Sequence, residues 1–202
     1  MKRYEIVKIS FEVNHPVIAN ACYDLGQTHF NSKKYDAAFE WLNNALEIQE
    51  KSLGEESKEA VDSWIFIGAV YHEKSDFPTA LEYFTSVLDI RKRSHGENSM
   101  ETAIACLNVG KTYLALEKYD NALQIYQYAE TIMHRNPFSA GYYLLDVYER
   151  IAEVYAEQKK YVESIEWNHK ALSLCESWLG SDNDQAVEIR DRIKRLVKEN
   201  PN

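Results

Sequence analysis

The sequence has few cysteines, no long apolar run and fewer basic than acidic residues. Three cysteines in 202 residues is an odd number without paired spacing, which favours a reduced, cytoplasmic setting over a secreted one. No stretch approaches the roughly 20 apolar residues that span a bilayer, so we expect no membrane partner. The net charge of -9 argues against nucleic acid as a direct partner, because phosphate binding needs a basic surface.

Motifs for catalysis and metal binding are also missing. The sequence has no glycine-rich phosphate loop, no nucleophile elbow and no paired-acid motif. None of its six histidines has metal-ligand spacing to a cysteine or to another histidine. No basic neighbour is evident that would lower a thiol pKa, so Cys22, Cys106 and Cys175 are interpreted as core or boundary residues and not as nucleophiles. We therefore predict a protein that is not an enzyme and has no catalytic residue, metal or cofactor.

The dominant feature of the sequence is a repeat with a constant step of 42 residues. The step is visible in three columns: Gly26, Gly68, Gly110 and Ala152; Tyr35, Phe77, Tyr119 and Tyr161; and Ala38, Ala80, Ala122 and Ser164. Small residues in two of the columns allow a pair of helices to cross closely. One such pair buries little apolar surface alone, so neighbouring pairs must stack to be stable.

Helix start and stop signals divide the chain into pairs of helices. Helices are predicted at about 16–31, 35–53, 58–74, 77–93, 99–116, 119–134, 139–158, 161–179 and 184–199. Four repeats are predicted at about 14–55, 56–97, 98–139 and 140–182, with a capping helix at 183–202. Residues 1–13 are predicted to be either the end of a preceding repeat or an N-terminal cap.

The predicted capping helix carries a basic run. Its members are Arg190, Arg192, Lys194, Arg195 and Lys198. We interpret this run as the solvated outer face of a terminal helix that needs no further neighbour. The alternative is a patch for an acidic partner.

The best copy of the repeat runs from Trp64 to Phe84. Its pattern, Trp64-x-x-Ile67-Gly68-x-x-Tyr71 and then Ala80-x-x-x-Phe84, resembles the tetratricopeptide repeat. The 42-residue period, with Leu53-Gly54-Glu55 and Leu179-Gly180 between repeats, resembles the kinesin-light-chain type over roughly residues 14–180. The resemblance implies an all-α fold, namely a right-handed α-solenoid of helix–turn–helix repeats. It also implies that the first helix of each repeat lines a concave groove.

Helical periodicity indicates which side chains face out of these first helices. We call them the groove stripe: Asn20, Tyr23, Asp24, Gln27 and Phe30; Asp62, Ile65, Phe66, Ala69 and His72; Ile104, Leu107, Asn108, Lys111 and Leu114; and Asp146, Glu149, Arg150 and Glu153. Apolar and acidic residues dominate the stripe, so we predict a peptide ligand with apolar anchors and some basic residues. For any single apolar member, the alternative is packing against the first helix of the next repeat or against the capping helix.

These observations favour a protein–protein interaction module that binds a peptide or protein segment in its groove. The alternative is a peptide-sensing regulatory domain of a larger signalling or transcription protein. A homodimer through an exposed edge of the first repeat is a further hypothesis. Tyr23, Gln27 and Phe66 occupy places where a carboxylate clamp would need cationic or amide groups, so a chaperone tail is not the expected ligand.

Overall fold

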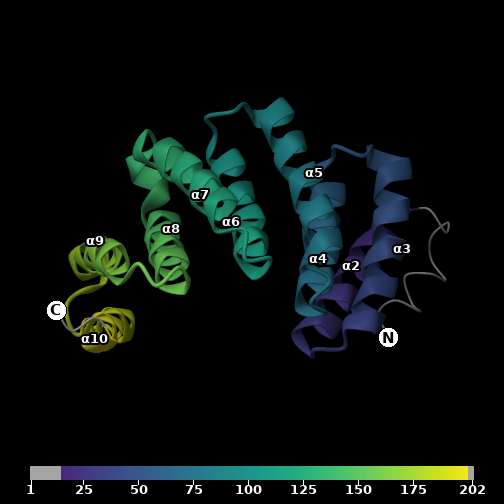
Figure 1. Cartoon of the computed structure of the whole chain (residues 1–202). Helices are drawn as coiled ribbons and strands as arrows, with labels where there is room; N and C mark the ends of the chain where they lie inside the picture. Colours follow the sequence, from purple (N-terminus) through teal and green to yellow (C-terminus); the bar gives the residue numbers. More distant parts are fainter. Residues whose placement is uncertain (1–14, 200–202) are drawn as a thin grey trace. The chain divides into compact units, whose positions relative to one another are not determined.

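The computed structural model describes residues 15–199, apart from the side chains of 137–140 (Figure 1). The elements of this range are α-helices separated by short turns. They are α2 (Pro16–Asn31), α3 (Tyr35–Leu53), α4 (Lys58–Glu73), α5 (Phe77–His95), α6 (Met100–Ala115), α7 (Tyr119–His134), α8 (Pro137–Glu157), α9 (Tyr161–Leu179) and α10 (Asp184–Glu199). The prediction of an all-α fold is confirmed.

The helices belong to two compact units. The N-terminal unit ends at Ser94 and contains α2 to α4 and all of α5 except its last residue, and the C-terminal unit begins at His95 and contains α6 to α10. The predicted division into four repeats stays a prediction. The hypotheses about residues 1–13, including the homodimer edge, lie outside the described residues.

Most helix bounds agree with the sequence prediction, and α8 shows the most informative difference. It begins at Pro137, two residues before the predicted start. A proline fits here because the first turn of a helix needs no N–H donor and accepts the fixed φ of proline. The extension makes α8 21 residues long, whereas α2, α4 and α6 each have 16.

The turns contain residues with positive φ, and these are of two kinds. Between repeats, Gly54, Gly96 and Gly180 have φ values of 93°, 94° and 87°, which glycine adopts without steric cost. Within a helix pair, the left-handed residue is not glycine: Lys33, Ser75, Glu117 and Lys159 have φ values of 57°, 62°, 56° and 59°. Gly54 and Gly180 belong to the predicted repeat pattern, whereas the second set was not predicted.

Close crossing of α2 and α3 depends on the small-residue column. A Cβ atom added to Gly26 would lie 2.6 Å from Cγ of Leu42, and Leu42 is itself fully buried. Leu42 continues into a core cluster with Ala38, Ile67 and Val70, which joins α2 and α3 to α4. The glycine is therefore required by packing, as the repeat pattern predicts.

Several hydrogen bonds between one helix pair and the next join residues that are 14 positions apart in the sequence, a separation we call the 14-residue register. In the N-terminal unit, Ser63 Oγ donates to Gln49 Oε1 at 2.7 Å, and Trp64 Nε1 donates to Glu50 Oε1 at 3.1 Å. The same separation recurs in the C-terminal unit between His134 and Tyr148 and between Glu176 and Arg190. These polar contacts connect the second helix of one pair to the next helix in the chain.

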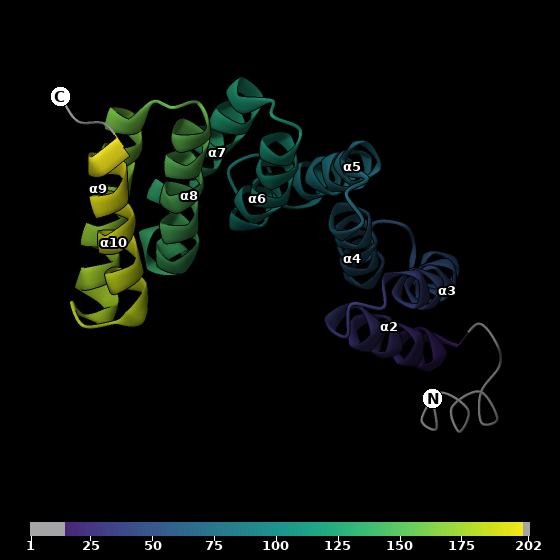
Figure 2. The ribbon, with the colours of Figure 1, turned by 60° about the horizontal axis from the view of Figure 1, so that its bottom comes forward.

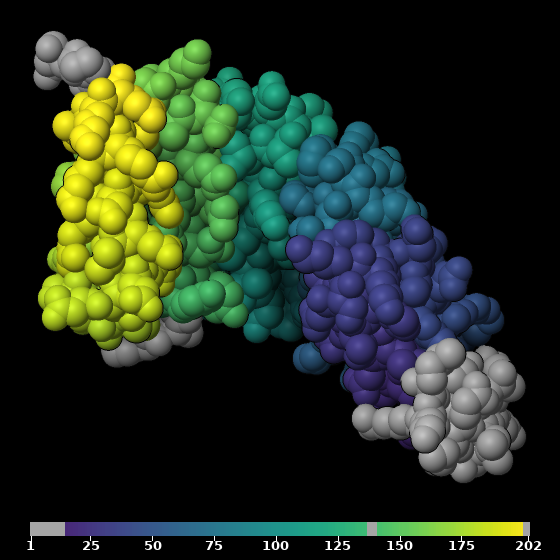
Figure 3. Space-filling model, turned by 90° about the horizontal axis from the view of Figure 1, so that it is seen from below, coloured from purple at the N-terminus to yellow at the C-terminus, as the bar shows by residue number. Residues whose placement is uncertain are grey.

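Helix α10 packs against α9 through one apolar face. Ala186, Ile189, Ile193 and Leu196 are buried in this contact. Figure 2 draws α10 in front of α9 and beside α8, and Figure 3 shows the yellow surface of α10 next to the green surface of α8. No helix within residues 15–199 combines the length and apolar content needed to cross a membrane.

The basic run of α10 is not simply a solvated face, and that interpretation was wrong for two of its members. Arg190 donates to Glu176 of α9 at 2.8 Å and also to the carbonyl oxygen of Ser181. Arg192 forms an ion pair with Glu149 of α8. Lys194 is exposed and pairs with Asp191 of the same helix at 2.9 Å, as a surface residue would. Two arginines thus tether the helix to its neighbours.

Candidate binding surfaces

The groove stripe keeps access to solvent in both units. Asn20, Asp24, Lys111 and Glu153 are exposed, and all other stripe residues are half-buried. This follows from helical periodicity, because the opposite faces carry buried residues such as Cys22, Ile67 and Cys106. The three cysteines are buried and form no disulfide within residues 15–199, and burial raises the pKa of the Cys22 thiol to about 11. The predicted core role of the cysteines is confirmed.

In the N-terminal unit, three helices surround a polar cavity of about 180 Å³. Its lining residues are Asn20, Tyr23, Gln49, Lys58, Glu59 and Asp62. The groove stripe contributes Asn20, Tyr23 and Asp62, so the structure brings together predicted residues of α2 and α4. The prediction missed Gln49, because it lies on the second helix of its pair and no stripe was assigned to those helices.

Charge in this cavity centres on Asp62. Lys58 Nζ lies 2.6 Å from one carboxylate oxygen, and Arg91 Nη2 lies 3.7 Å from the other. Burial, followed by the charge of Asp62, raises the pKa of Tyr23 to about 12. The Tyr23 hydroxyl accepts a hydrogen bond from Gln27 Nε2 at 3.2 Å. At neutral pH the cavity therefore presents a neutral phenol beside a paired carboxylate.

An aromatic cluster lies beside this cavity. The ring of Phe66 on α4 meets the rings of Tyr23 and Phe30 on α2 edge-on, at centroid distances of 5.6 and 5.7 Å. These three side chains also pack against the core that joins the helices. The alternative stated for single apolar stripe residues, packing against the next repeat, applies to Tyr23 and Phe30, which contact Phe66 of the second repeat. Phe66 is nevertheless only half-buried, so part of its side chain keeps contact with solvent.

In the C-terminal unit, the stripe of α6 is mainly apolar and that of α8 is charged. Ile104, Leu107, Asn108 and Leu114 are half-buried on α6, and Lys111 is exposed. On α8, Arg150 Nε donates to Asp146 Oδ1 at 3.1 Å and Arg150 Nη1 donates to Glu153 Oε2 at 2.8 Å. Burial alone would lower the pKa of Arg150, but the two carboxylates raise it.

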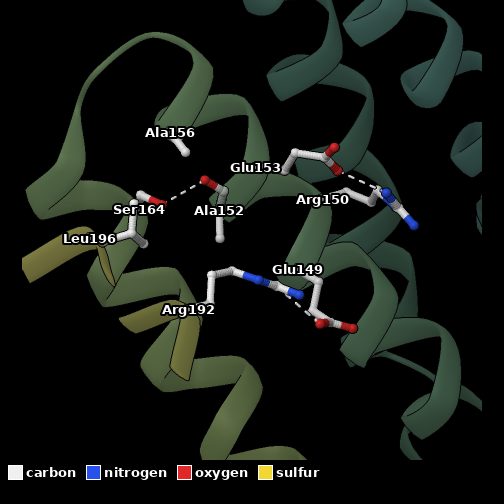
Figure 4. A pocket seen from close by; sticks show the side chains of 8 residues that line it. All are labelled: Glu149, Arg150, Ala152, Glu153, Ala156, Ser164, Arg192 and Leu196. Atoms are coloured by element: carbon white, nitrogen blue, oxygen red, sulfur yellow. Dashed lines mark hydrogen bonds and ion pairs between the residues drawn. The ribbon is translucent and has the colours of Figure 1, made fainter. Parts of the chain in front are cut away.

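A second cavity, of about 290 Å³, lies between α8, α9 and α10 (Figure 4). It is lined by Glu149, Arg150, Ala152, Glu153, Ala156, Ser164, Arg192 and Leu196. Arg192 Nη1 lies 3.1 Å from Glu149 Oε1 and donates to Asn168 Oδ1 at 3.3 Å. Figure 4 shows Arg192 facing Glu149, whereas the Arg150–Glu153 pair turns away from Arg192. The prediction named Glu149, Arg150 and Glu153 here, and it missed the contribution of α10.

The tether through Arg192 is testable by substitution. We expect Arg192→Met to lower the free energy of unfolding by about 1 kcal/mol, because buried Asn168 Oδ1 loses a donor and Glu149 loses its charged partner. Amide hydrogen exchange in α10 should become faster. Lys194→Met is the control, since Lys194 is exposed and its ion pair with Asp191 lies within its own helix. Equal stability of both variants would contradict a tethering role.

The sequence of the chain matches models of a known protein family. Models of the tetratricopeptide repeat match residues 17–92, 59–133 and 144–185. Together these matches cover more than half of the chain. A search of the curated proteins found no match.

Solved structures with the same fold come from several proteins. The TPR-like repeats of a kinesin light chain from Podospora anserina align with a TM-score of 0.77 and 16% identity, covering 91% of this chain and 87% of that chain. The apo form of RapI aligns with a TM-score of 0.76 and 20% identity, covering 97% of this chain and 52% of RapI. The Rap conjugation gene regulator of plasmid pLS20, in complex with the Phr* peptide, has a TM-score of 0.67 and 15% identity, with coverages of 91% and 55%.

Proposed function

Because the chain belongs to the tetratricopeptide repeat family, we propose that it is an interaction module that binds a peptide or protein segment on its groove stripe. A repeat family of this kind points to interaction and not to catalysis. The observation that carries the proposal is that every member of the stripe keeps solvent access, although its helices bury their opposite faces. Side chains that are accessible and held on rigid helices are suited to recognition.

The chemistry of the two surfaces supports a ligand with apolar anchors and basic residues. In the N-terminal unit, the half-buried rings of Tyr23, Phe30 and Phe66 form an aromatic surface next to Asp62. In the C-terminal unit, carboxylates outnumber guanidinium groups on α8. The net charge of -9 would further attract a cationic partner.

Selection from a displayed peptide library tests this proposal. The whole chain is the bait, and peptides that share apolar and basic residues are the expected result. Charge reversal by Asp24→Lys together with Glu153→Lys should weaken binding of a selected peptide roughly tenfold, the range for loss of strong interface contacts. Both positions are exposed, so the fold should tolerate the change.

Glu40→Lys together with Glu166→Lys is the matched control. These exposed residues lie on α3 and α9, outside the groove stripe, and give the same change in net charge. A selected peptide should bind this control as tightly as the parent chain. If the two double variants weaken binding equally, the effect is general electrostatics and the proposed surface is wrong.

A second candidate function is a peptide-sensing regulatory domain of a larger signalling or transcription protein. Similarity over 91% of this chain to the Rap conjugation gene regulator of plasmid pLS20, whose structure contains the Phr* peptide, supports it. Hydrogen exchange with a selected peptide separates the two candidates. Protection confined to α2, α4, α6 and α8 favours a simple binding module, whereas changes in the second helices of the pairs favour a sensor.

A further inference from the structure

Gln49 carries a buried side-chain amide of which only one end has a hydrogen-bond partner. The residue lies on α3 and is 2% exposed. Its Oε1 accepts from the Ser63 hydroxyl at 2.7 Å, whereas its Nε2 has no hydrogen-bond partner among the described residues. Buried polar groups in proteins nearly always have a partner, since a buried group without one is costly. The two unpaired N–H groups of Gln49 therefore need an explanation.

Equivalent positions in the repeat show that helix packing does not require this polar pair. Two steps of 42 residues after Gln49, the chain has Met133. Two steps after Ser63 it has Val147, and one step after Ser63 it has Ala105. These three residues are buried and apolar. The amide and the hydroxyl of the Gln49–Ser63 pair therefore need a reason other than the stacking of helices.

The Nε2 end of the amide faces the polar cavity between α2, α3 and α4. These three helices lie side by side in the N-terminal unit (Figure 2). Gln49 lines the cavity and Ser63 does not, so the amide end that is turned away from Ser63 is on the cavity side. The cavity volume of about 180 Å³ far exceeds the roughly 15 Å³ that one water needs. There is thus room for a small organic group next to Nε2.

Glu59 places an acceptor at the mouth of the same cavity. Asn20, Lys58 and Glu59 are exposed lining residues, so the cavity opens to solvent between them. The Lys58 ammonium pairs with Asp62 at 2.6 Å. The Glu59 carboxylate makes no hydrogen bond or ion pair with a described residue. Its oxygens are therefore available to a ligand.

Helix α4 sets the distance between this acceptor and the Gln49 amide. Glu59 precedes Ser63 by four residues, so both lie on one face of α4, roughly 6 Å apart along the helix axis. The Ser63 hydroxyl holds the Gln49 amide, and the Glu59 side chain is long and exposed. One planar amide group with a hydrogen bond at each end can therefore bridge the two residues.

We propose that this cavity binds the side-chain amide of an asparagine or glutamine residue of the ligand. The amide oxygen of the ligand accepts from Gln49 Nε2 inside the cavity, and its NH₂ group donates to the Glu59 carboxylate at the mouth. The inference rests on the proposed function, because it assigns one residue type of the bound segment. It also adds to the groove stripe a contact from the second helix of a pair.

An amide fits these groups better than a charged group does. The lining carboxylates of Asp62 and Glu59 outnumber the single lining cation, Lys58, so a further negative charge would be repelled. A cation would leave the Gln49 N–H groups without an acceptor. An amide is neutral and offers an oxygen to Gln49 and N–H groups to Glu59. A main-chain amide is flanked by two Cα atoms, so the free end of a side chain reaches further into a cavity.

Gln49→Met combined with Ser63→Ala removes the proposed donor and its partner together. The repeat already contains Met133 and Ala105 at the equivalent buried positions, so the fold accepts both residues. Gln124→Met is the matched control, because it makes the same chemical change at an exposed position of α7.

Binding is measured by NMR titration of the whole chain with acetamide, acetate and methylammonium. Acetamide has the functional group of an asparagine side chain. It should shift the side-chain NH₂ resonances of Gln49, which the spectrum of the double variant lacks, with a dissociation constant on the order of tens of millimolar. Acetate and methylammonium should leave these resonances in place.

The variants should change the affinity for acetamide, which is measured from the backbone amides at the start of α4. The double variant should bind acetamide roughly fivefold more weakly than the parent chain, the effect of about one lost hydrogen bond. Glu59→Met removes the proposed acceptor at an exposed position and should have an effect of the same size. Gln124→Met should bind acetamide as tightly as the parent chain does.

Each outcome decides the proposal. If acetamide does not shift the Gln49 NH₂ resonances, the cavity holds ordered water only and the proposal is wrong. A larger shift with acetate or methylammonium, or parent-like affinity of the double variant or of Glu59→Met, would also overturn it. If the double variant does not fold, Glu59→Met decides alone.

The proposed function is tested separately by the peptide library. If the chain selects peptides but binds no acetamide, the amide site is wrong and the proposed function stands. An acetamide site in a chain that selects no peptide would count against the proposed function alone. If both are correct, the selected peptides should share an asparagine or a glutamine.

Discussion

Gly110→Val should lower the free energy of unfolding by about 3 kcal/mol, the upper part of the range for overpacking a core. A Cβ atom at Gly110 would overlap the Tyr126 ring, and that ring is fully buried, so it has little room to retreat. Intrinsic helix propensity predicts the opposite sign, because glycine is the less favourable residue in a helix by a few tenths to about 1 kcal/mol. The sign of the change therefore separates packing from propensity. Urea denaturation gives the value.

Gly96→Ala is the control for this variant. Gly96 has a φ of 94° and no atom within 4 Å of an added Cβ, so only backbone strain opposes the change. We expect a loss of about 1 kcal/mol at Gly96. Hydrogen exchange should show faster opening of α6 and α7 in Gly110→Val, at the site of the overlap. Unchanged or increased stability of Gly110→Val would show that the Tyr126 ring can move aside.

Ser63→Ala should destabilise the N-terminal unit by about 2 kcal/mol. Ser63 and Gln49 are almost fully buried, and the Ser63 hydroxyl donates to Gln49 Oε1 at 2.7 Å. Removing the hydroxyl leaves the carbonyl oxygen of the Gln49 amide buried without this donor, and such an acceptor costs more than the hydrogen bond itself is worth. The free energy of unfolding of the single variant measures this cost.

A double-mutant cycle with Gln49→Met sharpens this test. Methionine has a similar volume and no group that needs a hydrogen bond, so Gln49→Met combined with Ser63→Ala should be close to the parent in stability. Ser52→Ala is a control on α3, the helix that carries Gln49. Ser52 is exposed, and its hydroxyl donates to the Ile48 carbonyl one turn earlier. If the loss in free energy of unfolding of the double variant equals the sum of the losses of the two single variants, Ser63 and Gln49 are not coupled. In that case their hydrogen bond does not stabilise the contact between α3 and α4.

Helix positions and the groove stripe could be predicted because they depend on local, periodic properties. Gly54 and Gly96 follow helix ends and have positive φ values, which glycine adopts readily, so glycine in the sequence signals the end of a helix. The stripe follows from 3.6 residues per turn. The left-handed turn residues Lys33 and Ser75 were not predicted, since their side chains carry no preference for that conformation. Likewise, no local signal distinguished Arg192, which reaches α8, from Lys194, which stays on its own helix.

The sequence by itself determined the repeat, the all-α class, the family resemblance and the accessible stripe. A 42-residue period repeated in several columns leaves little freedom for another fold. Only the tertiary structure decided which polar groups are satisfied. Asn168 and Tyr126 lie 42 residues apart, at equivalent positions of the repeat, yet the first accepts from an arginine and the second has no partner among the described residues. The reason is physical: a hydrogen bond is made or lost within a fraction of an ångström, and that distance depends on how helices pack rather than on spacing along the chain.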